Sequence, residues 1–313
     1  MTQEMRLEGP RFELDIDSRE YPPILKDSPE APATLYGIGN PDALQPGIAI
    51  IGARKASPYG LSCAELFARQ AARRGLTIIS GGARGCDQAA HRMALEEGAP
   101  TVVVFGSGAD VVYPKRGHEL FQRVIDQGGA IISENVWGTP PIAGLFVRRN
   151  RIIAGLAALV LIVEAGLPSG TFSTADAALR ANRDVAAIPG AISSPNSRGS
   201  NQLLAQGAYA VVDQDSLDTA IEMAFMHNTY ALLASRTQGE HMQDIDALID
   251  EDPLLRALAA EALSAQELAA YFDYSAGELS RCLSEYEIEG FVQRGRDGRY
   301  QICPKWKELH QII

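Results

Sequence analysis

Short apolar runs alternate with helical patterns from Gly47 to about residue 212, and this rhythm restricts the fold more than any other feature. Strands that alternate with helices are joined by right-handed crossovers, so the rhythm predicts an α/β fold with a mostly parallel, doubly wound sheet. The expected strands are Ile48–Ile51, Thr77–Ser80, Thr101–Phe105, Ala130–Ser133, Ala158–Val163, Val185–Ile188 and Tyr209–Val212. The helical patterns that separate most of them are Leu61–Arg74, Asp87–Glu97, Glu119–Gln127, Thr174–Asn182 and Asn201–Gln206. Ligands of such sheets bind at the carboxyl ends of the strands, so the loops that follow the strands are the expected site.

The chain divides into four segments. Residues 47–233 form the expected sheet domain, and residues 1–46, which are Pro-rich towards their end, are expected to pack on it as an N-terminal extension. Residues 234–251 are predicted to be an acidic linker. In residues 252–313, three short helical segments precede Gly290–Ile302, which has the pattern of a hairpin with an Asp-Gly turn. Three helices and a hairpin predict a small C-terminal winged helix.

The charge of the chain is unevenly distributed. The net charge is −11, yet the central residues 51–200 contain 16 Lys and Arg against 11 Asp and Glu. A local field attracts a ligand more strongly than the total charge repels it, so an anionic ligand remains possible in this central part.

Several classes of protein are not expected. No apolar run reaches the roughly 18 residues needed to span a bilayer. The N-terminal residues are acidic and polar, unlike a signal or transit peptide. We therefore expect a cytoplasmic protein with no membrane association. The 4 cysteines and 5 histidines show no metal-ligand spacing, so we expect no metal and no cofactor.

The stretch from residue 146 to residue 174 concentrates ligand-binding chemistry. It opens with an aromatic residue, an asparagine and three arginines: Phe146, Arg148, Arg149, Asn150 and Arg151. An apolar run, Leu156–Val163, follows and predicts a strand buried on both faces. After it come the small-residue loop Gly166–Thr171 and a new helix, whose free N–H groups and dipole favour an anion. These features predict a phosphate-bearing ligand. Alternatively, the arginines form an ordinary solvated helix start and Ser169-Gly170 is a plain turn.

Small-residue loops follow other expected strands as well. Gly52–Ser57 contains Arg54, and Ser80–Gly85 contains Arg84 and three glycines that permit close approach to a ligand. Several such loops at one sheet edge are hard to explain by turn chemistry alone. The usual nucleotide fingerprints do not occur, because neither G-x-G-x-x-G nor G-x-x-x-x-G-K-[ST] is found. Glu164 and Asp176 are expected to hold loop N–H groups and to favour the first turn of a helix, respectively, and not to act as an acid–base pair.

The motifs in these loops resemble the DNA-processing protein A (DprA/Smf) family, in order, from about Tyr21 to Val212. They are Ser80–Asp87 with Ala90-His91, Tyr113-Pro114, Ser133-Glu134, Arg149–Ile153, Glu164-Ala165, Ser169-Gly170, Pro189-Gly190, Gly199–Asn201 and Gly207-Ala208. The resemblance implies an extended Rossmann-like domain that binds single-stranded DNA, protects it and helps to load the RecA recombinase. It also implies a homodimer, a role in natural transformation and no catalysis.

The resemblance also implies particular contacts. The expected residues at the single-stranded DNA site are Arg54, Ser80, Gly81, Gly82, Arg84, Phe146, Arg148, Arg149, Asn150, Ser169, Gly170 and Thr171. Arginines hold phosphates, and Phe146 is expected to stack on a base, unless it is a core aromatic residue. By family analogy, dimerisation is expected around Leu203, Leu204 and Tyr209. Val147 and Gly117 depart from the residues usual in the family.

Two other functions remain open. One is a nucleotide-processing enzyme similar to the nucleoside monophosphate phosphoribohydrolases, although their Pro-Gly-Gly-x-Gly-Thr-x-x-Glu signature does not occur. The other is an interaction protein with a vestigial pocket. In the winged helix, the expected recognition helix contains several glutamates against Arg281 alone, which disfavours entry into a DNA groove. We expect that domain to bind protein or to be structural, with weak phosphate contact possible at Arg294, Arg296 and Arg299.

Overall fold

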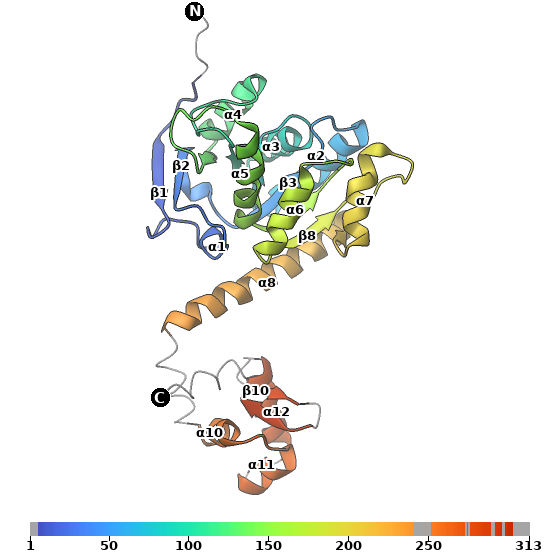
Figure 1. Ribbon diagram of the computed structural model, residues 1–313. Helices are drawn as coiled ribbons and strands as arrows, with labels where there is room; N and C mark the ends of the chain where they lie inside the picture. The colour runs from blue at the N-terminus through green and yellow to red at the C-terminus, as the bar shows by residue number, and fades with distance from the viewer. Residues whose placement is uncertain are drawn as a thin grey trace, which may run out of the picture. The chain divides into compact units, whose positions relative to one another are not determined.

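The structure, a computed structural model, describes residues 6–240, 252–272, 274, 276–288, 292–295 and 298–302. The chain forms two compact units, Met1–Leu233 and Ala234–Ile313 (Figure 1). Helix α8 (Gln214–Glu240) begins in the first unit and includes the first residues of the predicted linker. Residues 241–251 of that linker lie outside the described residues.

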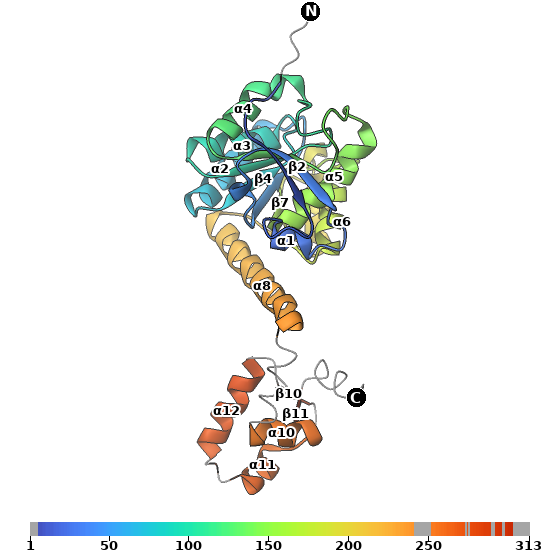
Figure 2. The ribbon, with the colours of Figure 1, turned by 90° about the vertical axis from the view of Figure 1, so that its left-hand side faces the viewer.

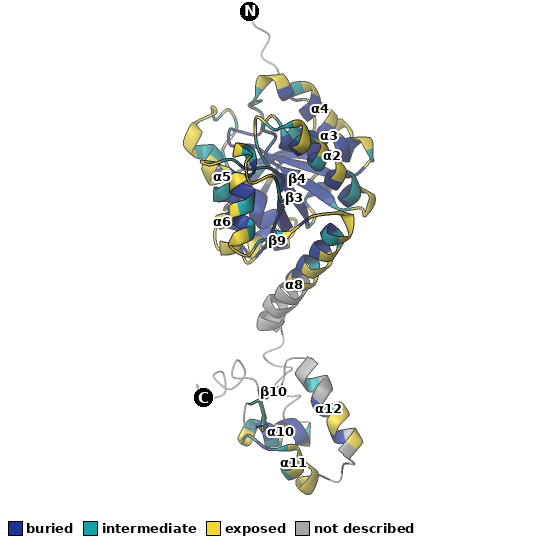
Figure 3. Cartoon of the chain, turned by 90° about the vertical axis from the view of Figure 1, so that its right-hand side faces the viewer, coloured by how far each residue is buried: buried dark blue, intermediate teal, exposed yellow. Residues whose placement is uncertain are grey.

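The first unit is built on one sheet. Its strands are β1 (Arg11–Asp15), β2 (Thr34–Gly39), β3 (Gly47–Ile51), β4 (Thr77–Ser80), β5 (Thr101–Val104), β6 (Ala130–Ser133), β7 (Ala157–Ile162), β8 (Asp184–Ala187) and β9 (Tyr209–Ala210). Their order across the sheet is β1-β2-β6-β5-β4-β3-β7-β8-β9. All neighbours from β6 to β9 pair in parallel, and β1 and β2 add to β6 in antiparallel fashion. The central strands are buried along their whole length, as Figure 3 shows for β3 and β4.

Helices cover both faces of this sheet, which confirms the doubly wound α/β fold (Figure 2). They are α1 (Pro23–Lys26), α2 (Pro58–Arg73), α3 (Cys86–Glu96), α4 (His118–Asp126), α5 (Ala143–Leu156), α6 (Thr171–Arg180), α7 (Arg198–Ala205) and α8, with single 3₁₀ turns at Pro41–Ala43, Lys115–Gly117 and Pro195–Ser197. One apolar cluster joins the sheet to α1, α5, α6 and α7, and two others join it to α2, α3, α4 and α8.

The chain changes direction across the sheet between β3 and β7. From β3 it proceeds outward through β4, β5 and β6, and it then returns to place β7 on the other side of β3. The loops after β3 and β7 therefore diverge towards opposite faces. Such a switch point opens a crevice at the carboxyl ends of the strands, where ligands of open α/β sheets bind.

Two elements differ from the expectation. Residues 1–46 were expected to pack on the sheet domain as an extension, but they supply β1 and β2, which extend the sheet itself at one edge. The stretch with the three arginines lies in helix α5, which ends at Leu156, directly before β7. Along a helix, neighbouring residues point about 100° apart, so consecutive arginines cannot all face one ligand.

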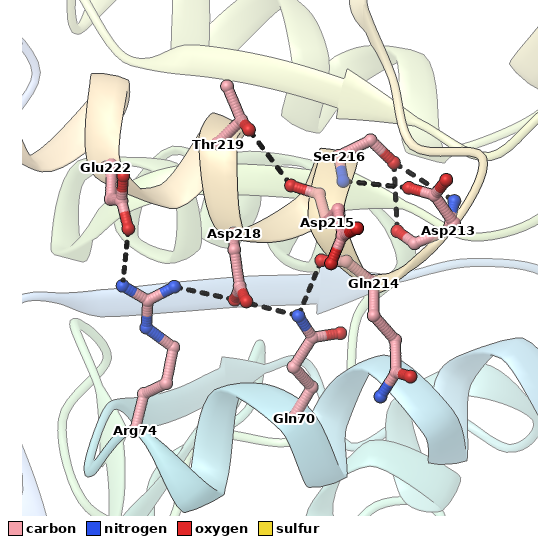
Figure 4. Close-up of polar contacts among 9 residues, drawn as sticks. All are labelled: Gln70, Arg74, Asp213, Gln214, Asp215, Ser216, Asp218, Thr219 and Glu222. Atoms are coloured by element: carbon pink, nitrogen blue, oxygen red, sulfur yellow. Dashed lines mark hydrogen bonds and ion pairs between the residues drawn. The ribbon is translucent and has the colours of Figure 1, made fainter.

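Helix α8 is fastened to α2 by polar contacts at its start (Figure 4). The guanidinium of Arg74 pairs with the carboxylates of Asp218 at 2.6 Å and Glu222 at 3.1 Å. Gln70 donates to the same Asp218 at 2.7 Å. The Asp213 carboxylate accepts from the Ser216 N–H, which satisfies one of the free donors at the start of the helix. These contacts fix where α8 begins.

The second unit has the three helices and the hairpin that the sequence predicts. They are α10 (Pro253–Ala260), α11 (Ala265–Tyr271), α12 (Ala276–Ile288), β10 (Val292–Arg294) and β11 (Tyr300–Ile302). Strands β10 and β11 are antiparallel, and leucines of all three helices form the core. Ser264 and Glu267 form a reciprocal capping box at the start of α11. Arg296, Asp297 of the predicted turn and the glutamate side chains of α12 lie outside the described residues.

Candidate nucleic-acid interface

A cavity of about 600 Å³ lies at the switch point between β3 and β7. Its walls come from the loop after β3, from one stripe of α5 and from the loop after β7 with the start of α6. Of the expected contact residues it is lined by Arg54, Phe146, Arg149, Asn150, Ser169, Gly170 and Thr171. A smaller cavity of about 70 Å³ shares Arg54, Phe146 and Arg149 with it and adds Gly81 and Arg84.

The start of α6 forms a wall of the large cavity, and its chemistry suits an anion. Gly170 stands at the N-cap position and has no side chain to cap the helix, and the first turn of α6 contains no acidic residue. The Ser169 and Thr171 hydroxyls lie 2.8 Å apart, and both residues line the large cavity. No carboxylate therefore offsets the positive end of the helix dipole within that turn, and hydroxyl donors stand beside it.

The three arginines of α5 separate into two groups. Arg148 and Arg151, three residues apart, share a face and both bind Glu134, at 2.9 and 2.7 Å. They line a different hollow, between α5 and α6. Only Arg149 faces the large cavity, and it is 5% exposed.

Arg149 and Asp87 hold the loop after β4 in place through hydrogen bonds to its backbone. The Arg149 guanidinium donates to the carbonyl of Gly81 at 2.9 Å and to that of Val104. The Asp87 carboxylate accepts from the N–H groups of Gly81 and Ala83 at 3.2 and 3.3 Å. Burial lowers the pKa of Arg149 to about 10, and the nearby Asp87 opposes this shift, so the guanidinium stays charged at neutral pH. Arg149 thus shapes the site from within the protein as well as lining it.

Arg54 and Arg84 are the accessible cations of the site. Both side chains are exposed, and within the described ranges no carboxylate forms an ion pair with either. The loops that carry them touch at Gly85, where an added Cβ would lie 2.2 Å from the carbonyl of Ala53. Gly85 also has a φ of +88°, which favours glycine. The close approach brings both arginines to the mouth of the same crevice.

Phe146 is half-buried and lies outside the apolar clusters of the sheet, so it is not a core residue. Its ring lies 5.1 Å from the ring of Tyr113, with the planes tilted by 47°. Tyr113 lines both cavities and is missing from the expected contacts, although the Tyr-Pro motif that contains it was available as a signal. Asp87 was likewise visible within the motif Ser80–Asp87.

Three expected contacts do not line either cavity: Ser80, Gly82 and Arg148. The Ser80 side chain is buried, and its hydroxyl donates to the carbonyl of Ile50 at 2.6 Å. A side chain on Gly82 would collide with Val103 and Phe121, so this glycine serves packing. Contact of DNA with these three residues stays a prediction.

Glu164 accepts hydrogen bonds from the N–H and the hydroxyl of Ser57 at 2.8 and 2.6 Å, which confirms that it holds loop N–H groups. Asp176 lies in the second turn of α6, so the expectation that it favours the first turn is wrong. Helix α6 begins at Thr171, three residues earlier than predicted. His91 is buried, and its Nδ1 lies 2.7 Å from the Thr101 hydroxyl.

Comparison with known proteins agrees with the family resemblance of the motifs. A family profile described as "DNA recombination-mediator protein A" matches residues 13–222. The chain belongs to this family. A second profile, "DprA winged helix domain", matches residues 242–298, which confirms the type of the second unit.

Relatives in the DNA recombination-mediator protein A family include Protein Smf of Escherichia coli, 41% identical over 213 residues, which are 67% of this chain and 57% of Smf. The chain therefore spans less than two thirds of that relative. DNA processing protein DprA of Streptococcus pneumoniae is 40% identical over 199 residues, 63% of this chain and 70% of that protein.

Two solved structures of the family are similar in fold. The X-ray structure of DprA from Streptococcus pneumoniae has a TM-score of 0.62 at 37% identity, over 68% of this chain and 75% of that one. A structure of DNA processing protein A from Helicobacter pylori has a TM-score of 0.62 at 30% identity, over 69% of this chain and 97% of that one. The Helicobacter pylori structure is described as showing a single-stranded DNA binding mode. In the part of this chain that the structure describes, no helix is both long and apolar enough to cross a membrane.

Proposed function

We propose that this protein is a non-catalytic, cytoplasmic single-stranded DNA-binding protein that protects incoming DNA and helps to load RecA in natural transformation. The observation that carries the proposal is the cavity between β3 and β7, which combines exposed Arg54, a helix start with no acidic residue in its first turn and an aromatic pair. Phosphates fit the first two, and unpaired bases fit the third. The family and the Helicobacter pylori relative support DNA as the ligand.

The partners belong to the proposal as well. RecA loading follows from the family resemblance. We propose a homodimer formed around α7 and β9, because β9 is the last strand on its side of the sheet and its outer edge is available for pairing. Of the three expected residues, Leu203 is buried, whereas Leu204 and Tyr209 are partly exposed, so the latter two are the better candidates for contact. For the winged helix we propose a protein-binding or structural role.

A nucleotide-processing enzyme gains no support from the site. Glu164, the carboxylate such a mechanism would use, is 2% exposed, and both its oxygens are bound to Ser57. A general base must reach the proton that it removes, whereas the Glu164 carboxylate is buried and hydrogen-bonded to Ser57 at the start of α2.

The test compares two arginine variants in fluorescence anisotropy with a labelled oligo-dT. Arg54→Ala removes an exposed cation from the cavity, and we expect a loss of about 1.5–3 kcal/mol, or about ten-fold to 150-fold in Kd. Arg148→Ala is the matched control, because Arg148 lies on the other face of α5 and is paired with Glu134. We expect little loss for it. The slope of log K against log salt should fall by about 0.7 in Arg54→Ala alone.

Absence of binding by the wild-type protein would refute the proposal. Binding that survives Arg54→Ala but fails in Arg148→Ala would move the DNA to the hollow between α5 and α6. RecA loading is tested separately, by whether the protein restores RecA-driven strand exchange on DNA already covered by a single-strand-binding protein.

A further inference from the structure

Trp137 lies in the loop after β6 and is held there by side chains from β1 and β2. Its indole Nε1–H donates to the Glu13 carboxylate at 2.7 Å, and the Arg11 guanidinium lies 4.5 Å from the centroid of its ring. The ring of Tyr36 meets it edge-on, with the two centroids 5.6 Å apart. Three side chains from the two added strands therefore fix one residue in a loop that comes 124 residues after Glu13.

Arg11 also connects this loop to the loop after β5. Its guanidinium lies 3.5 Å from Oδ2 of Asp110, and Oδ1 of Asp110 accepts from the N–H of Gly138 at 2.8 Å. The Gly108 N–H donates to the carbonyl of Thr139 at 2.9 Å. Strand β1 thus contacts both loops, and the two loops are hydrogen-bonded to each other at the same point.

The segment that is held in this way leads directly into a wall of the cavity between β3 and β7. Pro140 and Pro141 follow Thr139, and two prolines in succession permit little rotation of the backbone. Pro141 and Ala143 line the cavity, and α5 begins at Ala143 with no hydrogen bond from an N-cap side chain. A displacement of the loop at Trp137 would therefore move the start of α5 and the side chains that it presents to a ligand.

We infer that Glu13 and Arg11 are positioning residues for the DNA site, because they hold Trp137 and through it set where α5 begins relative to the cavity. The inference rests on the proposed function, since it concerns the same ligand. It gives β1 a part in binding although β1 lines neither cavity. A wall that is already in place does not have to be ordered when the ligand arrives, so loss of these contacts should lower the affinity.

The test separates positioning from charge. Glu13→Ala removes a carboxylate, which by electrostatics alone should strengthen binding of an anion. Loss of the bond to Trp137 should instead weaken binding of oligo-dT by about two-fold to twelve-fold in anisotropy titrations with the full chain, the equivalent of ordering one side chain. Glu13→Gln removes the same charge but keeps an oxygen that can accept from the indole N–H, so it should bind at least as tightly as the wild type. Glu97→Ala is the matched control and should not weaken binding, because Glu97 accepts from Arg69 and Arg73 and lines neither cavity.

A second readout distinguishes positioning from local packing. Trp137 and Trp306 are the two tryptophans of the chain, so Trp306→Phe leaves Trp137 as the only one. In that background we expect Glu13→Ala to increase the quenching of Trp137 fluorescence by acrylamide, and we expect saturating oligo-dT to reverse the increase. The reversal follows because coupling is reciprocal: a loop position that favours DNA binding is itself favoured by bound DNA.

Each outcome decides between the two proposals. If the wild type binds oligo-dT with the expected Arg54 dependence and Glu13→Ala binds it as tightly, the positioning inference is wrong and the proposed function stands. An equal loss in Glu13→Ala and Glu13→Gln would also overturn the inference, because the bond to the indole would then not be the cause. Quenching that rises in Glu13→Ala and does not respond to oligo-dT would mean that these contacts serve local packing only, which contradicts the inference. If the wild type binds no oligo-dT, the proposed function fails and this inference fails with it.

Discussion

Replacing Gly81 by alanine tests whether Arg149 supports the loop after β4 as the structure shows. An added Cβ at Gly81 would lie 2.6 Å from Nη2 of Arg149 and 2.8 Å from its Cζ. Contacts below 3.0 Å essentially do not occur for real Cβ atoms, so the guanidinium has to move. It is buried and bonded to two backbone carbonyls, and it cannot move without loss of at least one of these bonds.

The magnitude follows from those bonds. A hydrogen bond from a charged group contributes about 1.5–3 kcal/mol, so loss of one bond lowers the free energy of unfolding by about that amount, and loss of both by up to about 6 kcal/mol. With a urea m value of about 3 kcal/mol per M, the loss of a single bond shifts the midpoint by about 0.5–1 M. Because Gly81 lines the small cavity, binding of oligo-dT should weaken in the same variant.

The measurement is urea unfolding followed by tryptophan fluorescence, with Gly144→Ala as the matched control. Gly144 lies near the start of α5, and an added Cβ there meets nothing within 4 Å. Alanine should raise stability at that position by up to about 1 kcal/mol, since glycine is a poor helix former. If Gly81→Ala unfolds at the same midpoint as the wild type, Arg149 does not hold the loop, and its assignment as a supporting residue is wrong.

Two further predictions concern residues that do not line either cavity. Burial lowers the pKa of His91 to about 3 from its ordinary 6.5, so the unfolded chain takes up a proton that the folded one refuses as the pH falls below 6.5. Stability should then fall by about 1.4 kcal/mol per pH unit from this group down to about pH 3, and His91→Gln should remove that part of the slope in urea titrations at pH 7 and pH 5. Ser57→Ala should cost about 1 kcal/mol for the lost cap of α2, and more because buried Glu164 loses the hydrogen bond from the Ser57 hydroxyl and keeps only that from the backbone N–H. Ser57→Thr should retain most of the stability in thermal unfolding. A Ser57→Ala protein as stable as the wild type would contradict the role given to Glu164.

The parallel strands could be predicted because burial on both faces leaves uninterrupted apolar runs, and Thr77–Ser80 and Ala130–Ser133 have the predicted bounds. β1 was missed because RFELD is an edge strand whose charged residues face solvent. Helix α5 was missed because its buried end, Ile152–Leu156, runs directly into β7 and makes one apolar stretch with it. The sequence pattern does not mark the boundary between α5 and β7, because the packing of the helix on the sheet sets it.

The loops of the site could also be predicted, since small residues after several strands mark the ligand edge of the sheet. The geometry within them could not. Arg149 faces the cavity, whereas Arg148 and Arg151 face the Glu134 carboxylate on the other side of α5. This division depends on where the helix begins and on the position of Glu134, and neither can be read from the local sequence. The pairing of Tyr113 with Phe146 joins residues from separate loops, and no local pattern reports it.

The switch point between β3 and β7 also sets the order in which the site can be made during synthesis. Arg54 precedes Ser169 by 115 residues, so the wall after β3 is translated before the wall after β7. At about 5–20 residues per second, the wall after β7 follows the wall after β3 by roughly 6–23 s. During that interval the edge of β3 that later pairs with β7 has no partner. Capture of a ligand at this cavity is a property of the finished domain, because a nascent chain that stalls before Thr171 lacks the wall that the start of α6 supplies.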